Sequence, residues 1–481
     1  MNVKNYYQDQ GLLFPPHLRD CLPDDHQVVI INDVVETLNL SGLYRKVSSE
    51  GHPAYHPKMM LKVLIYAYAN GIFSSRKIQA ALQESIAFIY LAAWQKPDFR
   101  TISDFRQHNL AEFQELFSQV VDVCRQLGMI SLGHIAIDGS KFKANAADSR
   151  TYDRQRVQQA IQELLQQADQ LDQREDRLHG PDNPGAPVPE AVRKQKDRLE
   201  KLQQIKKQLD QSDREKINAT DPEAVFMKNG GRLRTSYNGQ IVVDENQIIV
   251  AAEVTIDPSD TEQLIPMVEQ AERRIGPLDK LSADSGYSQG ENLQALADKK
   301  IDAHIPDANY QGCRRGKTEA PGPGLFPRSS FQRDEQQDCF ICPVGQKLTL
   351  VRMQKVKNKK PLRLYRCHAC QECPQRDRCT KSRQGRSLTL NAYDDQFRAM
   401  RTKLDSPHGR RIYSRRQAMV EPVFGHIKGV LGFCQFHLRG LLKVGGEFAL
   451  ICIAHNVRKI INKLKVPSPF GPRIVVEGAT A

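Results

Sequence analysis

The sequence predicts a mixed α/β protein in which a helical N-terminal region precedes a core that is interrupted by two inserts. Three observations predict this organisation. Apolar residues recur with helical spacing as far as about residue 130. Short apolar runs then alternate with amphipathic stretches between residues 131 and 465, as strands and helices do in an α/β core. Two segments within that core, 150–218 and 308–390, differ from it in composition.

The N-terminal region, residues 1–130, is predicted to form several short helices. Pro57–Asn70 has apolar residues at helical spacing, and a second helix over 74–83 begins at a serine cap. An apolar run over 86–94 and a helix over 103–117 follow. Short helices that carry Lys and Arg fit a DNA-binding module of the helix-turn-helix kind, and they fit equally a helical bundle that forms dimer contacts. The sequence leaves both interpretations open.

The core is predicted to begin with a strand over His134–Ile137 that delivers Asp138 at its end, after which Gly139 and Ser140 turn the chain. The later elements are, in order, a hairpin of strands over 235–244 and 247–255, a helix over 261–275 capped by Asp260, a strand over 280–283 that ends in Asp284, a helix over 290–300 and a strand over 302–305. Three strands followed by helix, strand, helix and strand is the order of an RNase-H-like fold.

The two inserts have different characters. In residues 150–218, helical stretches over 154–178 and 190–212 flank a loop rich in Pro and Gly, which predicts an antiparallel helical hairpin. This hairpin is either a solvated structural element or an arm that contacts DNA. Residues 308–390 are predicted to be loop-rich, basic and cysteine-bearing. Beyond them, 394–464 is predicted to be helical and 466–481 to be a flexible tail.

The charge of the chain indicates the kind of partner. A formal net charge of +13 points to a polyanion, most often nucleic acid. The longest apolar runs are far shorter than the ~20 residues that a bilayer requires, and the N-terminus lacks the apolar segment of a secretory signal. We therefore expect a cytoplasmic protein, associated with the nucleoid and not with a membrane.

Two carboxylates are candidates for catalysis. Asp138 and Asp284 each follow a short apolar strand, where an acid is otherwise rare. Each also stands next to turn residues, so either one alone could be an ordinary turn acid. Phosphodiester chemistry on DNA uses two divalent ions, and Mg²⁺ (or Mn²⁺) takes oxygen ligands from a few carboxylates. Lys141 and Lys143 lie just beyond Asp138, where they can meet phosphates.

Glu421 is the candidate for a third acid. Apolar residues flank it on both sides, and Lys428 lies seven residues on, two turns along the same helical face. An acid and a cation on one face suit a metal ion and a DNA phosphate, although a surface ion pair would have the same spacing. Glu447 is a rival, but its place beside two glycines at the start of an apolar helix favours a helix start or a buried partner.

The second insert contains a cluster of cysteines. Cys339-x2-Cys342 and Cys367-x2-Cys370 are spaced like zinc knuckles, because each pair can give two thiolates to one tetrahedral ion. Cys373 and Cys379 are further candidates, so the ligand set stays open. Basic residues surround the cluster and predict a structural zinc ribbon that also touches DNA. The alternative is a set of free buried thiols.

These segments resemble the DDE transposases of bacterial insertion sequences, in the branch with an N-terminal helical domain and a cysteine-bearing insert. The resemblance covers about residues 25–463. The segments that carry it are AIDGSKFKANA around Asp138, ADSGY around Asp284, RRQAMVEPVFGHIK around Glu421, the N-terminal stretch from His56 to Asn109, and the closing RGLLKVGGEFALICIAHNVRK.

The resemblance implies an RNase-H-like catalytic domain over 131–465 in which Asp138, Asp284 and Glu421 hold two Mg²⁺ ions. It implies that Lys428 and Arg416 contact DNA near the cut. Tyr413 is the nearest match to a tyrosine that precedes the Arg and Glu in that family.

The implied activity is binding to the terminal inverted repeats of double-stranded DNA, metal-dependent cleavage, and attack of the freed 3′ hydroxyl on target DNA. A homodimer is expected, because two DNA ends must be joined. A catalytically inactive DNA-binding protein, such as a repressor of its own element, is the main alternative. The presence of all three acids favours the active enzyme. A nuclease without strand transfer is a third interpretation, which the large basic inserts argue against.

Overall fold

The computed structural model describes residues 17–47, 50, 53–179, 190–308, 310, 324–356 and 359–465. The predicted tail at 466–481 and the Pro/Gly loop of the first insert, beyond His179, lie outside the described residues.

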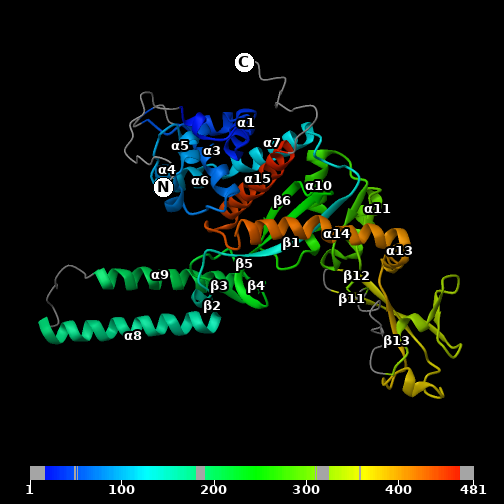
Figure 1. Cartoon of the computed structure of the whole chain (residues 1–481). Helices are drawn as coiled ribbons and strands as arrows, with labels where there is room; N and C mark the ends of the chain where they lie inside the picture. Colours follow the sequence, from blue (N-terminus) through cyan, green and yellow to red (C-terminus); the bar gives the residue numbers. More distant parts are fainter. Residues whose placement is uncertain are drawn as a thin grey trace, which may run out of the picture.

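A mixed six-stranded sheet forms the centre of the chain and confirms the predicted fold class (Figure 1). Its order is β4-β5-β1-β7-β8, and β6 pairs with β5 as well. β1 runs antiparallel to β5 and parallel to β7, and β7 runs parallel to β8. The strands and their two helices are β1 (Ile135–Lys143), β4 (Val225–Asn229), β5 (Arg232–Asp244), β6 (Ile249–Thr255), α10 (Leu264–Ile275), β7 (Lys280–Ser282), α11 (Gly290–Asp298) and β8 (Asp302–His304).

β1 differs from its prediction. The predicted turn at Gly139 and Ser140 is wrong, because the strand continues to Lys143 with Gly139 opposite Gln240 on β5. The glycine is needed for a close approach: a Cβ atom at Gly139 would lie 2.7 Å from Asp260 Oδ1 and would collide with the Gln240 amide. Asp138 therefore stands in the middle of a paired strand.

The N-terminal helices share one hydrophobic core with the sheet. Helix α15 (Leu441–Lys465) lies between them, and its Asn456 accepts from Ile249 N on β6 at 2.9 Å. The predicted helix over 103–117 is divided at Asn109, where the backbone leaves the helical region. The boundary of a separate N-terminal domain at residue 130 stays a prediction. The helices are α1 (Gln27–Glu36), α2 (Ser41–Tyr44), α3 (Pro57–Ala69), α4 (Ser75–Glu84), α5 (Ile86–Ala92), α6 (Phe99–His108) and α7 (Leu110–Gln126).

The first insert is a helical hairpin, as predicted. Helices α8 (Arg154–His179) and α9 (Glu190–Gln211) extend away from the sheet (Figure 1). They arise from a two-stranded ribbon of β2 (Thr151–Asp153) and β3 (Lys216–Asn218). A small core between the helices contains Val157, Leu164, Leu202, Ile205 and Leu209. This core fixes which face of α9 is turned away from α8.

The second insert contains a folded antiparallel sheet that the sequence analysis did not predict, and turns and loops join its strands. Its strand order is β13-β12-β11-β10-β9, around a core that includes Phe340, Leu348 and Tyr365. The basic run from Lys355 to Lys360 lies at the end of the β11–β12 hairpin, with Lys357 outside the described residues. The strands are β9 (Gln332–Asp334), β10 (Cys339–Ile341), β11 (Lys347–Val356), β12 (Lys359–Arg366) and β13 (Ser387–Leu390).

The chain returns to the core through two helices, α13 (Asp394–Asp405) and α14 (Pro407–Gly425). Buried side chains of α14, among them Val420 and Val423, pack into the same core as the sheet. A π-helical turn over His426–Val430 follows, and its Lys428 bonds to β1. Among the described helices, none is long and apolar enough to cross a membrane.

Candidate active site

The parallel pairing of β1 and β7 brings the first two acids together. Ala136 on β1 lies opposite Ser282 on β7. Asp138 and Asp284 each follow two residues later, and residues two apart in extended chain face the same side. Their charges interact, since Asp284 raises the pKa of Asp138. The sequence-predicted pair is thus adjacent in the structure.

Asp138 is a partly buried carboxylate held by a cation. Burial raises its pKa to about 6, and Arg416 opposes that rise. Arg416 Nη1 lies 3.3 Å from Asp138 Oδ2, and Gly139 N donates to Asp138 Oδ1 at 2.9 Å. A carboxylate whose charge is costly in this environment would bind a further cation favourably.

Asp284 occupies the cap position of a short 3₁₀ turn that follows β7. Its Oδ1 accepts from Gly286 N at 2.8 Å, which fixes the side chain. Burial raises its pKa, and the neighbouring Asp260 raises it as well. For both sequence-predicted aspartates, burial is thus the main cause of the raised pKa, and a neighbouring acid adds to it.

Arg416 extends from α14 into this pair of acids. Its side chain is buried, with 8% of the residue exposed, and its Nε has no hydrogen-bond partner among the described residues. A buried donor without a partner is costly, so this Nε is suited to an additional anionic acceptor. Tyr413 lies one turn earlier on α14, and it contributes to the raised pKa of Arg416.

Glu421 lies on the same helix but not on the same face as Arg416. Five residues separate them, which turns Glu421 by about 140° around the helix, and its side chain is exposed. Within the described part of the chain, no group of three or more His, Cys, Asp or Glu side chains is arranged to hold a metal ion. The structure thus joins Asp138 and Asp284, and it leaves Glu421 apart from them.

Lys428 forms hydrogen bonds to β1 just beyond Asp138. Its Nζ donates to Ser140 Oγ at 2.6 Å and to Lys141 O at 2.8 Å, and it lies 4.4 Å from the centre of the Phe142 ring. Burial lowers the pKa of this lysine. In this conformation Lys428 fixes the π-helical turn to the strand.

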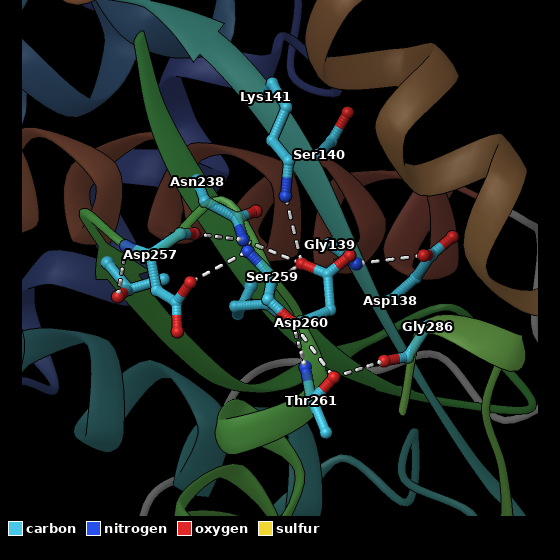
Figure 2. A network of polar contacts seen from close by, with 12 residues as sticks. Asp138, Gly139, Ser140, Lys141, Asn238, Asp257, Ser259, Asp260, Thr261 and Gly286 are labelled. Atoms are coloured by element: carbon cyan, nitrogen blue, oxygen red, sulfur yellow. Dashed lines mark hydrogen bonds and ion pairs between the residues drawn. The ribbon is translucent and has the colours of Figure 1, made fainter. Parts of the chain in front are cut away.

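Asp260 is a site residue that sequence reasoning missed. It was expected to cap a helix, yet its carboxylate makes no side-chain cap bond with the described turn that follows. Its Oδ1 instead accepts from Lys141 Nζ at 3.0 Å and from Asn238 Nδ2 at 2.7 Å (Figure 2). It also accepts from Gln240 Nε2 at 2.7 Å. The sequence did contain a signal for this residue, because Asp260 follows strand β6 of the core by a few residues, much as Asp284 follows β7.

The rival acid Glu447 has a structural environment. It is fully buried on α15 and accepts from Tyr68 Oη at 3.2 Å, from His437 N at 2.9 Å and from Leu438 N at 3.0 Å. These bonds join helices α3 and α15 and the chain before α15. Its role as a buried partner agrees with the choice of Glu421 as the candidate.

The cysteines of the second insert surround a small cavity of about 10 Å³, room for roughly one water-sized sphere. The lining cysteines are Cys342, Cys367, Cys370, Cys373 and Cys379. Two of their sulfurs accept from backbone amides, Cys342 from Gln346 N and Cys370 from Arg386 N, both at 3.3 Å. Cys339 is 2% exposed on β10 and is absent from the described lining of the cavity.

The six cysteines between Cys339 and Cys379 are free thiols in the structure. Burial raises the pKa of Cys367 to about 11, so this group is protonated unless a cation displaces its proton. The spacing of these side chains is not that of a formed metal site within the described residues.

Two protein families match parts of the chain. Residues 341–461 match the Transposase DDE domain, and residues 16–108 match the Transposase domain (DUF772). The first match includes α14 with Arg416 and Glu421, and it begins beyond Asp138 and Asp284. No curated protein matches the chain. A transposase DDE domain implies an RNase-H-like core and phosphoryl transfer. The two matches are consistent with a DDE transposase of an insertion sequence.

Proposed function

We propose that this chain cuts DNA at the terminal inverted repeats of its own insertion sequence and joins the freed ends to target DNA. The observation that carries the proposal is the register of β1 and β7, which sets Asp138 beside Asp284 under the guanidinium of Arg416. The helix that supplies Arg416 also carries Glu421 and lies within the match to the DDE domain.

Asp138, Asp284 and Glu421 are the proposed ligands of two Mg²⁺ or Mn²⁺ ions. The donor set is all oxygen, as these ions prefer. Burial raises the pKa of both aspartates and a neighbouring acid raises it further, so a bound cation would stabilise their charged forms. When bound, such ions activate the attacking oxygen and stabilise the leaving one. Glu421 would complete this set of oxygen ligands from α14, the helix that also supplies Arg416.

The remaining side chains of the site would orient the DNA. Arg416 has a buried Nε free of partners in the described residues, and this donor suits a phosphate oxygen near the cut. Asp260 holds the ammonium of Lys141, three residues along β1 from Asp138. Lys428 bonds to Ser140, two residues from Asp138 on β1, and its contact with DNA would require release of that bond.

The test is cleavage of a duplex that carries the element's own end, in Mg²⁺, followed by a search for strand-transfer products. Wild type should cut at the element boundary, and Asp138→Asn and Asp284→Asn should bind the duplex but cut at least about 10³-fold more slowly. If wild type binds the end and does not cut, the inactive DNA-binding protein is the better description. If it cuts but never joins ends, it is a nuclease. A shift from one to two chains on paired ends would support the homodimer.

We also propose that the cysteine cavity binds one structural zinc ion. Backbone amides that donate to Cys342 and Cys370 favour the thiolate form that zinc requires. Four ligands would come from the five cysteines that line the cavity. Cys339, which the sequence spacing paired with Cys342, would not be one of them.

A further inference from the structure

We propose that the phosphate backbone of duplex DNA binds in a basic groove between the helical hairpin of the first insert and the core, on a path that leads away from the active site. This inference rests on the proposed function and assigns a surface to its DNA substrate.

The groove lies where the hairpin joins the core. Its first part has a volume of about 820 Å³. Among the described residues, the lining holds a single acid, Asp197, and five basic side chains: Arg150, Lys194, Arg198, Lys201 and Arg439. Such an excess of cations is typical of a site for a polyanion.

The second part of the groove reaches the catalytic strand. A cavity of about 400 Å³ shares Arg150 and Arg439 with the first and adds Lys143, the last residue of β1. Arg439 Nε donates to Asn145 O at 2.9 Å, which holds its guanidinium where the two cavities meet. The two cavities therefore form one path from β1 to α9.

The path begins at a defined distance from the acids. Lys143 lies five residues along β1 from Asp138, which is about 17 Å in an extended strand. Duplex DNA rises 3.4 Å per base pair, so this length corresponds to about five base pairs. A duplex whose cut phosphate lies at Asp138 would meet the groove about five base pairs away and α9 beyond that.

The face that α9 presents to the groove has a regular charge pattern. Lys194, Arg198 and Lys201 are spaced i, i+4 and i+7, so they fall on one face of the helix. Leu202 and Ile205, buried against α8, hold that face in place. Three other exposed lysines of α9, Lys196, Lys206 and Lys207, lie outside the described lining of either cavity.

These two sets of three cations provide a matched comparison. The groove variant is Lys194→Gln with Arg198→Gln and Lys201→Gln, and the control variant is Lys196→Gln with Lys206→Gln and Lys207→Gln. Both remove three charges from exposed positions of the same helix, so both change the net charge equally. Arg150→Gln, on the core side of the groove, is an independent variant that leaves α9 intact.

The measurement is the affinity for a duplex of the element's end, with about 20 base pairs internal to the cut, over a range of salt concentrations. Each lost phosphate contact should reduce the slope of log K against log salt by about 0.9. The groove variant should lose up to about 2.7 of slope and bind roughly 10- to 100-fold more weakly, and the control should stay within about threefold of wild type. Arg150→Gln should reduce the slope by about 0.9, the value for one lost phosphate contact. In the groove variant, the DNA should lose its protection from hydroxyl radicals at positions more than about five base pairs inward of the cut. Protection at the cut itself should remain.

Equal losses of DNA affinity in the groove and control variants would overturn the proposed groove, because they would show only a general effect of net charge. The groove would also be overturned if the groove variant had the salt slope and the footprint of wild type. If wild type then cut normally, the proposed function would still stand. If wild type neither binds nor cuts the end, the groove and the proposed function both fail.

Discussion

Arg416 on α14 and Asp138 on β1 form an ion pair with 3.3 Å between Nη1 and Oδ2, both largely buried. This contact joins the helix that carries Glu421 to the strand that carries the first acid. It places a fixed positive charge beside a carboxylate whose pKa burial raises to about 6.

Replacing Arg416 should slow catalysis far more than it weakens DNA binding. In Arg416→Gln, Asp138 loses its charged partner and the site loses a donor near the cut, which predicts a loss of about 10²- to 10³-fold in single-turnover cleavage. Arg415→Gln is the control, because the adjacent Arg415 is exposed and pairs with Glu245 instead. Equal rates for the two variants would show that the ion pair has no part in the reaction.

Asp260 should act through Lys141. Asp260→Asn removes the negative charge that holds the Lys141 ammonium, and we expect cleavage to fall by about 10- to 100-fold, the scale of a lost, partly buried ion pair. A double-mutant cycle with Lys141→Met tests the coupling, since the second substitution should cost much less once the first is made. Fully additive effects on the cleavage rate would contradict it.

The sequence predicted the acids better than their surroundings. Asp138 and Asp284 were recognisable because each follows an apolar strand, and the family resemblance implied that they act together. The turn at Gly139 could not be distinguished from a close contact, because both require glycine and the contact is made by Gln240 and Asp260, about 100 residues away. Asp260 was missed because an acid before a helix satisfies the ordinary rules for a cap.

The second insert shows the same limit of local patterns. Strands β11 and β12 lie in a segment for which the sequence predicted only a basic, loop-rich and cysteine-bearing insert. Tertiary contacts around Phe340 and Tyr365 provide the core that makes them a sheet. Cys339 and Cys342 are close in sequence, yet the sheet turns the first into that core and the second into the cavity.

The cysteine cavity should bind zinc without Cys339. The purified chain should contain one zinc ion, Cys370→Ser should lose it, and Cys339→Ala should keep it although the variant is less stable. Elemental analysis of the three proteins, with melting curves before and after a chelator, measures this. Loss of zinc from Cys339→Ala, or no zinc in wild type, would contradict the assignment.

His455 should make the protein less stable in mild acid. Burial lowers its pKa to about 3, and the residues that face it are His426 at 2.9 Å, the Gln247 carbonyl at 2.9 Å and the charge of Lys459. A histidine with a depressed pKa in the folded state gives stability that is present above its unfolded pKa near 6.5 and is lost as the pH falls. At pH 5 the loss is about 2 kcal/mol in the free energy of unfolding.

Urea unfolding at pH 7 and pH 5 measures this effect, and His455→Gln is the matched variant. The difference between the two pH values should shrink by about that amount in His455→Gln, because glutamine does not titrate. An unchanged difference would show that His455 is not the group responsible.

Cleavage by Glu421→Gln tests the central claim most directly, because Glu421 is the acid that the structure leaves exposed and apart from Asp138 and Asp284. The assay uses the duplex with the element's end in Mg²⁺, with Glu291→Gln as a control at another exposed glutamate. We predict that Glu421→Gln binds the duplex like wild type and cuts at least about 10³-fold more slowly, while Glu291→Gln cuts normally. Cleavage by Glu421→Gln at the wild-type rate would contradict a three-carboxylate site.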